Sequence, residues 1–241
     1  MRIILLCWLA TLVTVLAASP ASAGSFSVTP VRVDLDPGGR AQTVELRNDG
    51  AAAVMIQVEA FDWTDRAEAV EELAPTGDVL AAPPVFEFGP GESQIIRLAL
   101  RRPLAGAEER AYRLVISEVP NELQAGNGVA VALRLNLPVF VTPPGAAPEP
   151  VWTAHRLPDG GGELRLSNPG TAHVQLRRIR LAAEEGRGRP LLDTEEADRV
   201  LAGRERVWRF DAGTLPPSAR LRVNAVTNAG ELDAVVPLQS G

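Results

Sequence analysis

In residues 129–141 every second side chain is valine or leucine and those between are mixed, and this pattern restricts the possible folds more than any other part of the sequence. The odd positions are all valine or leucine, namely Val129, Val131, Leu133, Leu135, Leu137, Val139 and Val141. Because successive side chains of a β-strand point to opposite faces, the alternation predicts a strand with one continuous apolar face. At about 3.3 Å per residue this strand would span roughly 40 Å. Most strands are shorter, at about 3–10 residues.

Pro138 lies inside this expected strand and indicates where the strand belongs in a sheet. Proline has no backbone N–H to donate to a neighbour, so it is found almost only at sheet edges and bulges. A long edge strand with an apolar row can pair with a second chain. We therefore expect residues 129–141 to form an edge that binds a partner. An ordinary strand with one face buried in its own domain is the alternative.

Residues 1–23 have the features of an export signal. Arg2 precedes an apolar run over residues 3–18, and an Ala-Ser-Ala sequence at 21–23 suits signal peptidase, so we expect cleavage before Gly24. The apolar run is shorter than the about 20 residues of a membrane span. We expect an exported, soluble protein that does not insert into the membrane after signal cleavage. In a bacterium this protein would be in the periplasm or beyond.

Short alternating runs recur through the rest of the chain, separated by turn sequences, while helical periodicity is nearly absent. This pattern predicts an all-β protein. About seven strands are expected before residue 142, starting with residues 27–35, which is the number in one immunoglobulin-like sandwich. The proline-rich segment 142–150 predicts a stiff linker between a first domain, residues 24–141, and a smaller β-sandwich domain, residues 151–241. No close internal repeat is evident.

The residues that catalysis or metal binding would need are scarce. Histidine occurs only at His155 and His173, and the sole cysteine, Cys7, leaves with the signal. No triad, nucleophile elbow or metal-ligand spacing is recognisable. Adjacent acids such as Glu108 and Glu109 are expected to be solvated loop charges. The sequence therefore predicts neither an enzyme nor a cofactor or metal site.

The charge of the chain bears on its possible partners. A formal net charge of −6 makes the protein a poor non-specific binder of nucleic acid. All 24 basic residues are arginine. Any anion site in this protein must therefore use guanidinium groups, which can hold a carboxylate through two hydrogen bonds.

Several short motifs occur in the order known from one protein family. These stretches are Pro83-Pro84-Val85, Phe88-Gly89-Pro90-Gly91, Ile96-Arg97-Leu98, Tyr112-Arg113-Leu114, Glu118-Val119-Pro120, residues 131–143, Trp152, Leu166-Ser167-Asn168-Pro169 and residues 224–230. Together they make the chain resemble the periplasmic pilus chaperones of the chaperone–usher pathway. The pattern from Asn168 to His173 is most similar to the archaic branch, which serves spore-coat-U-type subunits.

This resemblance implies two immunoglobulin-like domains in a boomerang arrangement. It also implies that the protein binds pilus or fimbrial subunits, each a sandwich that lacks its last strand, and delivers them to an outer-membrane usher. Chaperone–pilin complexes are a standard example of recognition by strand addition. The donor strand would present Val129, Val131, Leu133, Leu135, Leu137 and Val139, with Val131 to Leu137 filling the groove of the subunit.

The family also holds the C-terminal carboxylate of the subunit with two basic residues. One of these positions falls on Arg32, and the other, a lysine in the donor strand, falls on Pro138. The second cation must therefore come from elsewhere. Arg97 is the first candidate because it lies in a matching motif, and Arg177 is the candidate from the second domain.

Two other functions are compatible with a secreted two-domain β-sandwich. A structural or adhesive protein displayed outside the cell would lack an arginine cluster between its domains and would pair with itself. A carbohydrate-binding accessory of an enzyme would need an exposed row of aromatic side chains. We expect the chaperone function rather than either of these.

Overall fold

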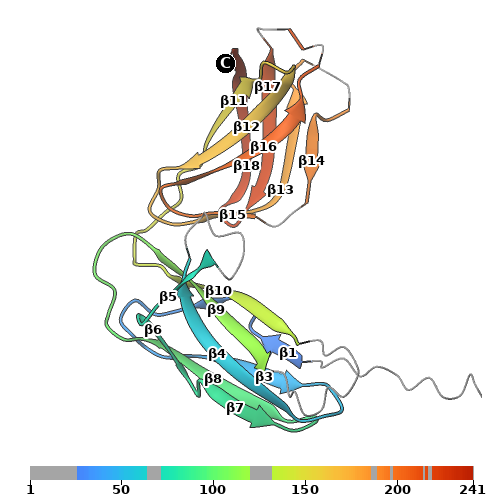
Figure 1. Cartoon of the computed structure of the whole chain (residues 1–241). Coiled ribbons are helices and arrows are strands. Elements are labelled where there is room, and N and C mark those ends of the chain that lie inside the picture. The colour runs from blue at the N-terminus through green and yellow to red at the C-terminus, as the bar shows by residue number, and fades with distance from the viewer. Residues whose placement is uncertain are drawn as a thin grey trace, which may run out of the picture.

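The computed structural model describes residues 26–63, 72–119, 132–185, 189–195, 198–213, 215–216 and 219–240. The segment 1–23, expected to be an export signal, lies outside these residues. The regular elements of the described chain are the strands β1 to β18, which form two lobes set at an angle to each other (Figure 1). The all-β fold with two β-sandwich domains in a bent arrangement is therefore confirmed.

The first lobe consists of two sheets. Its strands are β1 (Phe26–Thr29), β2 (Val33–Asp34), β3 (Gln42–Asn48), β4 (Val54–Asp62), β5 (Ala74–Pro75), β6 (Val79–Ala82), β7 (Val85–Phe88), β8 (Ser93–Leu100), β9 (Arg110–Val119) and β10 (Arg134–Val141). One sheet has four strands in the order β1-β3-β8-β6. The other has six strands, in the order β2-β10-β9-β4-β5 with β7 also paired to β4.

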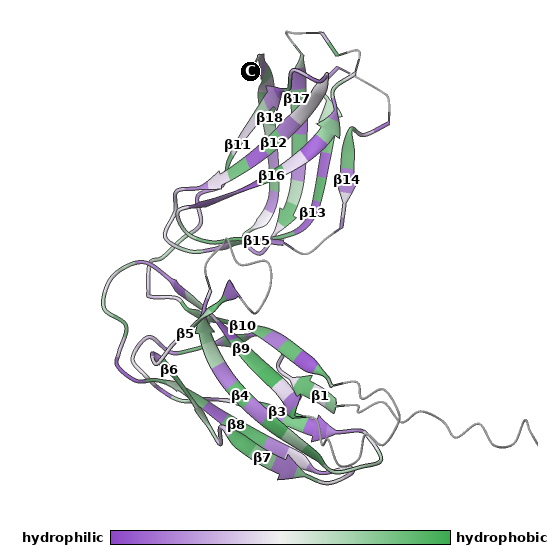
Figure 2. Ribbon diagram, viewed as in Figure 1, coloured by the Kyte–Doolittle hydropathy of each residue, from purple (hydrophilic) through white to green (hydrophobic). Residues whose placement is uncertain are grey.

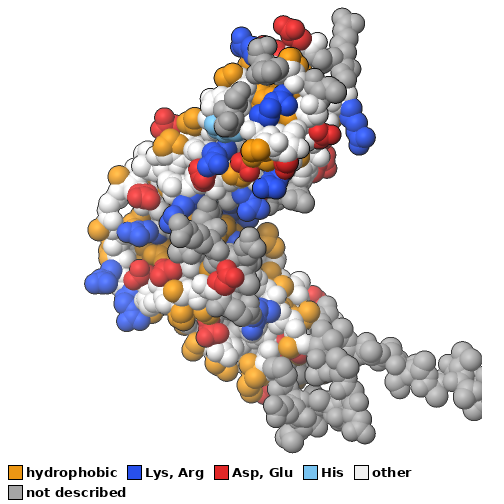
Figure 3. Space-filling view, turned by 45° about the horizontal axis from the view of Figure 1, so that its top comes forward, with side chains coloured by type: hydrophobic (Ala, Val, Ile, Leu, Met, Phe, Trp, Pro, Cys, Tyr) orange, Lys and Arg blue, Asp and Glu red, His pale blue; other side chains and the backbone are white. Residues whose placement is uncertain are grey.

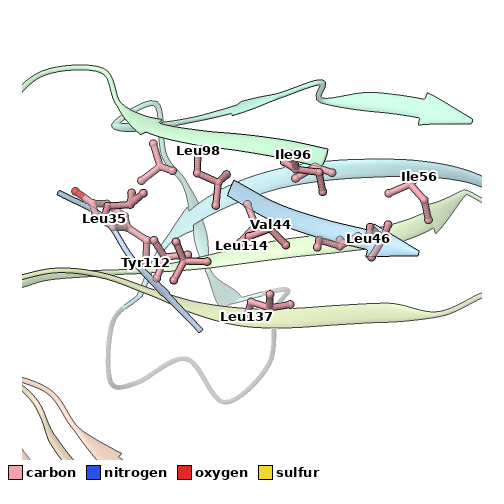
Figure 4. Packing of buried hydrophobic residues seen from close by; sticks show 14 of the residues in the cluster. Leu35, Val44, Leu46, Ile56, Ile96, Leu98, Tyr112, Leu114 and Leu137 are labelled. Carbon is pink, nitrogen blue, oxygen red and sulfur yellow. The ribbon is translucent and has the colours of Figure 1, made fainter. Parts of the chain in front are cut away.

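Alternation along the strands builds the core between these sheets (Figure 2). On β3, Val44 and Leu46 are fully buried while Glu45 between them is exposed. Figure 4 shows these side chains, with Leu114 and Leu137 of the facing sheet, in the interior of the sandwich. Burying each such side chain stabilises the domain by about 1.5–3 kcal/mol.

The first expected strand, residues 27–35, is divided into two in the structure. Its front part, β1, pairs antiparallel with β3, and its rear part, β2, pairs parallel with β10 in the other sheet. Pro30 lies between the two parts, and a residue without a backbone N–H cannot continue a hydrogen-bond ladder. The chain therefore crosses from one sheet to the other at this point and brings Arg32 next to β10.

The second lobe is one bent sheet of eight strands. Its strands are β11 (Val151–Arg156), β12 (Gly161–Asn168), β13 (Val174–Ala183), β14 (Leu192–Thr194), β15 (Asp198–Val200), β16 (Arg204–Asp211), β17 (Arg220–Thr227) and β18 (Gly230–Ser240). The order is β14-β13-β17-β18-β11-β12-β16, with β15 also paired to β13. Strand β18 pairs first with β17 and then with β11, so it joins the two halves around a common core.

A short internal repeat that the sequence analysis did not find becomes evident in the two domains. Asn48 and Asn168 each start an Asn-x-Gly-x-Ala-x-Val sequence and are each buried. In both, the side-chain N–H₂ donates to the carbonyl four residues later at 2.8 Å, and the side-chain oxygen accepts from the glycine two residues later. The repeat was missed because the residues between the shared positions differ.

The segment between the domains, residues 142–150, contains no strand and is held against the second domain. Ala147 and Thr171 exchange two hydrogen bonds, and the Glu149 N–H donates to Asn168 Oδ1 at 2.9 Å. A Cβ on Gly170 would lie 2.5 Å from Ala147 O, so only glycine allows this close approach. These contacts hold the connection in one position.

Candidate functional site

Strand β10 has one open side. It pairs antiparallel with β9 along its whole length, from Arg134 opposite Ser117 to Val141 opposite Arg110. On the other side, β2 pairs only with Val139 and Phe140. No other strand in the described part of the chain pairs with this side, so the edge is unpaired before Val139.

The directions in which the backbone N–H and C=O groups of β10 point explain how the strand accommodates a proline. Leu133 O accepts a hydrogen bond from the Glu118 N–H on the β9 side, whereas Phe140 O accepts one from the Leu35 N–H on the β2 side, both at 2.8 Å. Backbone groups alternate in direction along an antiparallel pair, so the even-numbered residues point away from β9. Pro138 is one of these, and its missing N–H therefore costs no hydrogen bond to β9.

The side chains of the apolar row differ in how deeply they are buried along β10. Leu137 and Val139 are 4% and 1% exposed and belong to the domain's own core, so a partner has no access to them here. Leu135 is half-buried against that core, and Leu133 is also half-buried. Val129 and Val131 lie outside the described residues. Within the described residues, the accessible part of the predicted donor row thus consists of Leu133 and Leu135.

The even-numbered face of β10 is directed toward the second domain. Phe140 is fully buried there, stacked on the ring of His173 at 3.9 Å between centroids, with Trp63 at 5.7 Å. Arg32 lies over the same ring at 5.0 Å. Phe140 is therefore a buried contact between the two domains, beside the cleft that the two lobes leave between them (Figure 3). Figure 3 shows the concave side that the two lobes leave between them, with arginine side chains (blue) at its margin.

Arg32 is the predicted cation that the structure places in this cleft. Two of its nitrogens donate to Asp34 Oδ1 at 2.7 and 3.0 Å, and a third, Nη1, donates to Gln175 Oε1 of the second domain at 3.3 Å. Its side chain remains 31% exposed. It directly precedes Val33, the first residue of β2, and thus lies where the open edge of β10 ends.

Arg113 was not among the predicted site residues, although it lies in the Tyr112-Arg113-Leu114 motif. It is directly opposite Pro138 in the β9–β10 register, and opposite residues of an antiparallel pair have their side chains on the same face. Its guanidinium lies 3.4 Å from the centroid of the Trp63 ring. Burial, together with the charge of Arg199, lowers the pKa of Arg113 to about 10.

Arg199 was also missed, since its sequence surroundings match no motif of the family. It is on β15, directly opposite Gln175. Burial first, and then the charge of Arg32, lowers the pKa of Arg199. Its buried Nε finds no hydrogen-bond partner among the described residues. Arginines 32, 113 and 199 therefore lie near one another at the junction of the two domains.

The structure does not bring the other two predicted arginines to this junction. Arg97 is on β8, in the four-stranded sheet, and is exposed between the core residues Ile96 and Leu98. It faces solvent on the sheet that does not contain β10. Arg177 is exposed on β13, at a shift in register between Leu176 and Arg178.

Glu109 and His173 form a buried pair between the two domains. Glu109 Oε1 accepts hydrogen bonds from the His173 backbone N–H at 3.0 Å and from its Nδ1 at 2.8 Å, and Thr142 Oγ1 donates to Oε2 at 2.6 Å. Glu109 is 7% exposed, so the expectation of a solvated loop charge was wrong for this residue. Burial raises the pKa of Glu109, but the hydrogen bonds from His173 and Thr142 outweigh it and lower the pKa overall.

A family model described as pili and flagellar-assembly chaperone, PapD N-terminal domain, matches residues 25–147. The chain belongs to this family. A chaperone protein FimB/FhaD from Bordetella pertussis is 26% identical over 181 residues, which cover 70% of this chain and 73% of that protein. The chain is therefore a pilus-assembly chaperone of the kind that its motifs indicated.

Solved structures show the same two-domain fold. A chain of the CsuC–CsuE chaperone–tip adhesion subunit complex from the archaic Csu pili of Acinetobacter baumannii has a TM-score of 0.64 at 19% identity, covering 90% of this chain and 99% of that chain. The Escherichia coli chaperone DraB has a TM-score of 0.61 at 16% identity, with 88% and 96% covered. These likenesses agree with the two sandwiches described above.

The described residues contain no group of three or more His, Cys, Asp or Glu side chains that could hold a metal ion. They also contain no helix of the length and apolar character needed to cross a membrane.

Proposed function

We propose that this chaperone binds a pilus or fimbrial subunit by adding the open side of β10 to the subunit's incomplete sandwich. The observation that carries the proposal is the absence of a described strand beside β10 before Val139. The donor segment would run from Pro138 toward residue 129. Leu133 and Leu135 would enter the groove of the subunit, and Leu137 and Val139 would support the strand from the chaperone's own core.

The energy of this pairing comes mainly from apolar burial. Each leucine buried in the groove contributes about 1.5–3 kcal/mol. Each ladder hydrogen bond adds about 1 kcal/mol net. Association costs about 4–15 kcal/mol, so a few buried side chains and a short ladder must act together. The apolar row therefore supplies most of the affinity, and the ladder sets the register.

The direction of the bound strand follows from the position of the arginines. Strand β2 runs parallel to β10 and occupies its outer side from Val139 onward. A subunit strand laid parallel on the open edge would end where β2 begins. Its terminal carboxylate would then meet Arg32, next to β2, and Arg113, opposite Pro138. Guanidinium–carboxylate pairs of this kind form strong, two-pronged hydrogen bonds.

Arg113 thus takes the role for which Arg97 and Arg177 were the candidates. The hydrogen bond from Arg32 to the second domain goes to Gln175, and Arg177 takes no part in it. Arg97 is exposed on β8, in the sheet that does not contain β10. We further infer that the protein works in the periplasm after removal of residues 1–23 and passes its subunit to an outer-membrane usher. Support for this comes from the signal-like sequence and from the family to which the chain belongs.

Replacement of Leu133 by arginine tests the donor edge. We expect Leu133→Arg to abolish capture of a subunit encoded beside this gene, because a charged side chain cannot enter an apolar groove. The measurement is co-purification of the subunit after co-expression in the periplasm, with the thermal unfolding midpoint of each free variant as a check on folding.

Ile95→Arg is the matched control for this test. Ile95 is 54% exposed on β8, in the sheet that does not contain β10, so the same substitution there should leave capture intact. Capture by folded Leu133→Arg at the level of the unchanged protein would refute donation by this edge.

A further inference from the structure

The cleft contains a third arginine, and this one belongs to the second domain. Arg32 and Arg113 lie on the first domain, whereas Arg199 lies on β15. Arg199 is directly opposite Gln175, and residues in such a pair have Cβ atoms about 4.5–5.5 Å apart. Since Arg32 donates a hydrogen bond to Gln175, Arg32 of the first domain and Arg199 of the second lie close to the same glutamine.

Two of the three guanidinium groups, those of Arg113 and Arg199, form no ion pair with an acid in the described part of the chain, and the nearby acids are engaged elsewhere. Arg32 is paired with Asp34. Asp198, the acid next to Arg199 in sequence, forms an ion pair with Arg206 through Oδ2 at 2.8 Å. Arg113 lies on the Trp63 ring, and the Nε of Arg199 is buried without a hydrogen-bond partner in the described chain. Like charges held together in this way favour binding of an anion.

We propose that Arg199 forms the second domain's half of the carboxylate site, so that one carboxylate bound between Arg113 and Arg199 joins the two domains. The two carboxylate oxygens can accept hydrogen bonds from both guanidinium groups at once. The inference rests on the proposed function for the source of the carboxylate, which is the last residue of a bound subunit. Capture of a subunit would then also hold the domains in their relative positions.

The test compares two forms of one synthetic peptide, acetyl-Thr-Val-Thr-Val-Thr-Phe with a free carboxyl terminus and the same peptide as its amide. Calorimetry with the full mature chain measures both affinities. We expect the unchanged protein to bind the carboxylate form about tenfold more tightly or better. Arg199→Gln should reduce this ratio to about threefold or less, and Arg113→Gln should reduce it similarly.

Arg222→Gln is the matched control, since it removes one positive charge from the same domain at an arginine that pairs with Asp233 on β18. It should leave the ratio unchanged. Arg199→Gln should not lower the thermal unfolding midpoint of the free protein, because it removes a repelling charge, whereas a merely structural role predicts a lower midpoint.

An unchanged peptide ratio in Arg199→Gln would overturn the inference, and so would equal binding of both peptides by the unchanged protein. The donor edge is judged separately, by subunit capture with Leu133→Arg. Leu133→Arg could abolish capture while Arg199→Gln leaves the affinity ratio of the two peptides unaltered. That pair of results would refute the role of Arg199 and still support the proposed function.

Discussion

Arg113 and Pro138 lie opposite each other on β9 and β10, and this pairing keeps a cation in the cleft without a lysine in β10. The outward direction of the Pro138 nitrogen means that the proline disturbs no hydrogen bond to β9. The cross-strand neighbour supplies the guanidinium on the same face. Under the proposed function, Arg113 would supply the positive charge that Pro138 cannot.

Tyr112 offers a prediction at the residue scale, because it is the only tyrosine in the chain. Burial, and then the nearby charges of Asp78 and Asp62, raise the pKa of Tyr112 to about 12. A raised pKa means that the neutral phenol stabilises the fold below pH 10.0, the ordinary value. This contribution is lost as the pH rises toward about 12.

Ultraviolet absorbance of tyrosinate measures this titration directly. We expect the native protein to titrate near pH 12 and the urea-unfolded protein near 10.0. Tyr112→Phe should abolish the signal and reduce the alkaline loss of stability. Native titration near pH 10.0 would contradict the burial of this phenol.

At the scale of elements, β10 serves two purposes along its length. Its C-terminal half is part of the first domain's core, with Leu137, Val139 and Val141 buried, and β2 covers its outer side there. Its N-terminal half has an open outer side and half-buried leucines. The anchored half holds the open half in an extended conformation, which lowers the ordering cost of binding a partner.

The connection between the domains gives a second prediction at this scale. Gly170→Ala should destabilise the protein by about 1–3 kcal/mol, because the new Cβ would overlap with the backbone of the connecting segment. The atoms concerned are Ala147 O and Glu149 N, both at 2.5 Å. Chemical denaturation measures the change in the free energy of unfolding.

Gly77→Ala is the control, since the nearest atom to its Cβ would be the flexible Arg101 side chain at 3.7 Å. It should change the free energy of unfolding by less than about 0.5 kcal/mol. Equal effects of the two substitutions would show that the connecting segment is not held as described.

For the whole molecule, the buried pair of Glu109 and His173 couples the two domains. Glu109→Ala should cost about 2–4 kcal/mol, because it leaves the buried donors of His173 without an acceptor. Glu108→Ala, at the exposed neighbouring position, should cost less than about 0.5 kcal/mol. In calorimetry we expect one unfolding transition for the unchanged chain and two separate transitions for Glu109→Ala.

The same pair makes the free energy of unfolding depend on pH in the acid range. The folded-state pKa of Glu109 is lowered below its ordinary value of 4.5, so its contribution to stability is present above pH 4.5 and is lost as the pH falls through the lower folded value. The difference in unfolding free energy between the unchanged protein and Glu109→Ala should therefore shrink below pH 4.5. A difference independent of pH would rule out an ionised Glu109 in this contact.

Features that depend on local period and on single residues could be predicted from the amino-acid order alone. Alternation predicted a strand over residues 129–141, of which the structure shows Arg134–Val141 as β10. Pro138 indicated an edge position, and successive short motifs indicated the family. Which side chains meet at the cleft could not be predicted, because cross-strand register and the packing of two domains bring arginines 32, 113 and 199 together from distant segments. The tertiary structure also decided that Leu137 and Val139 are buried, because an alternating row shows which face is apolar but not what covers it.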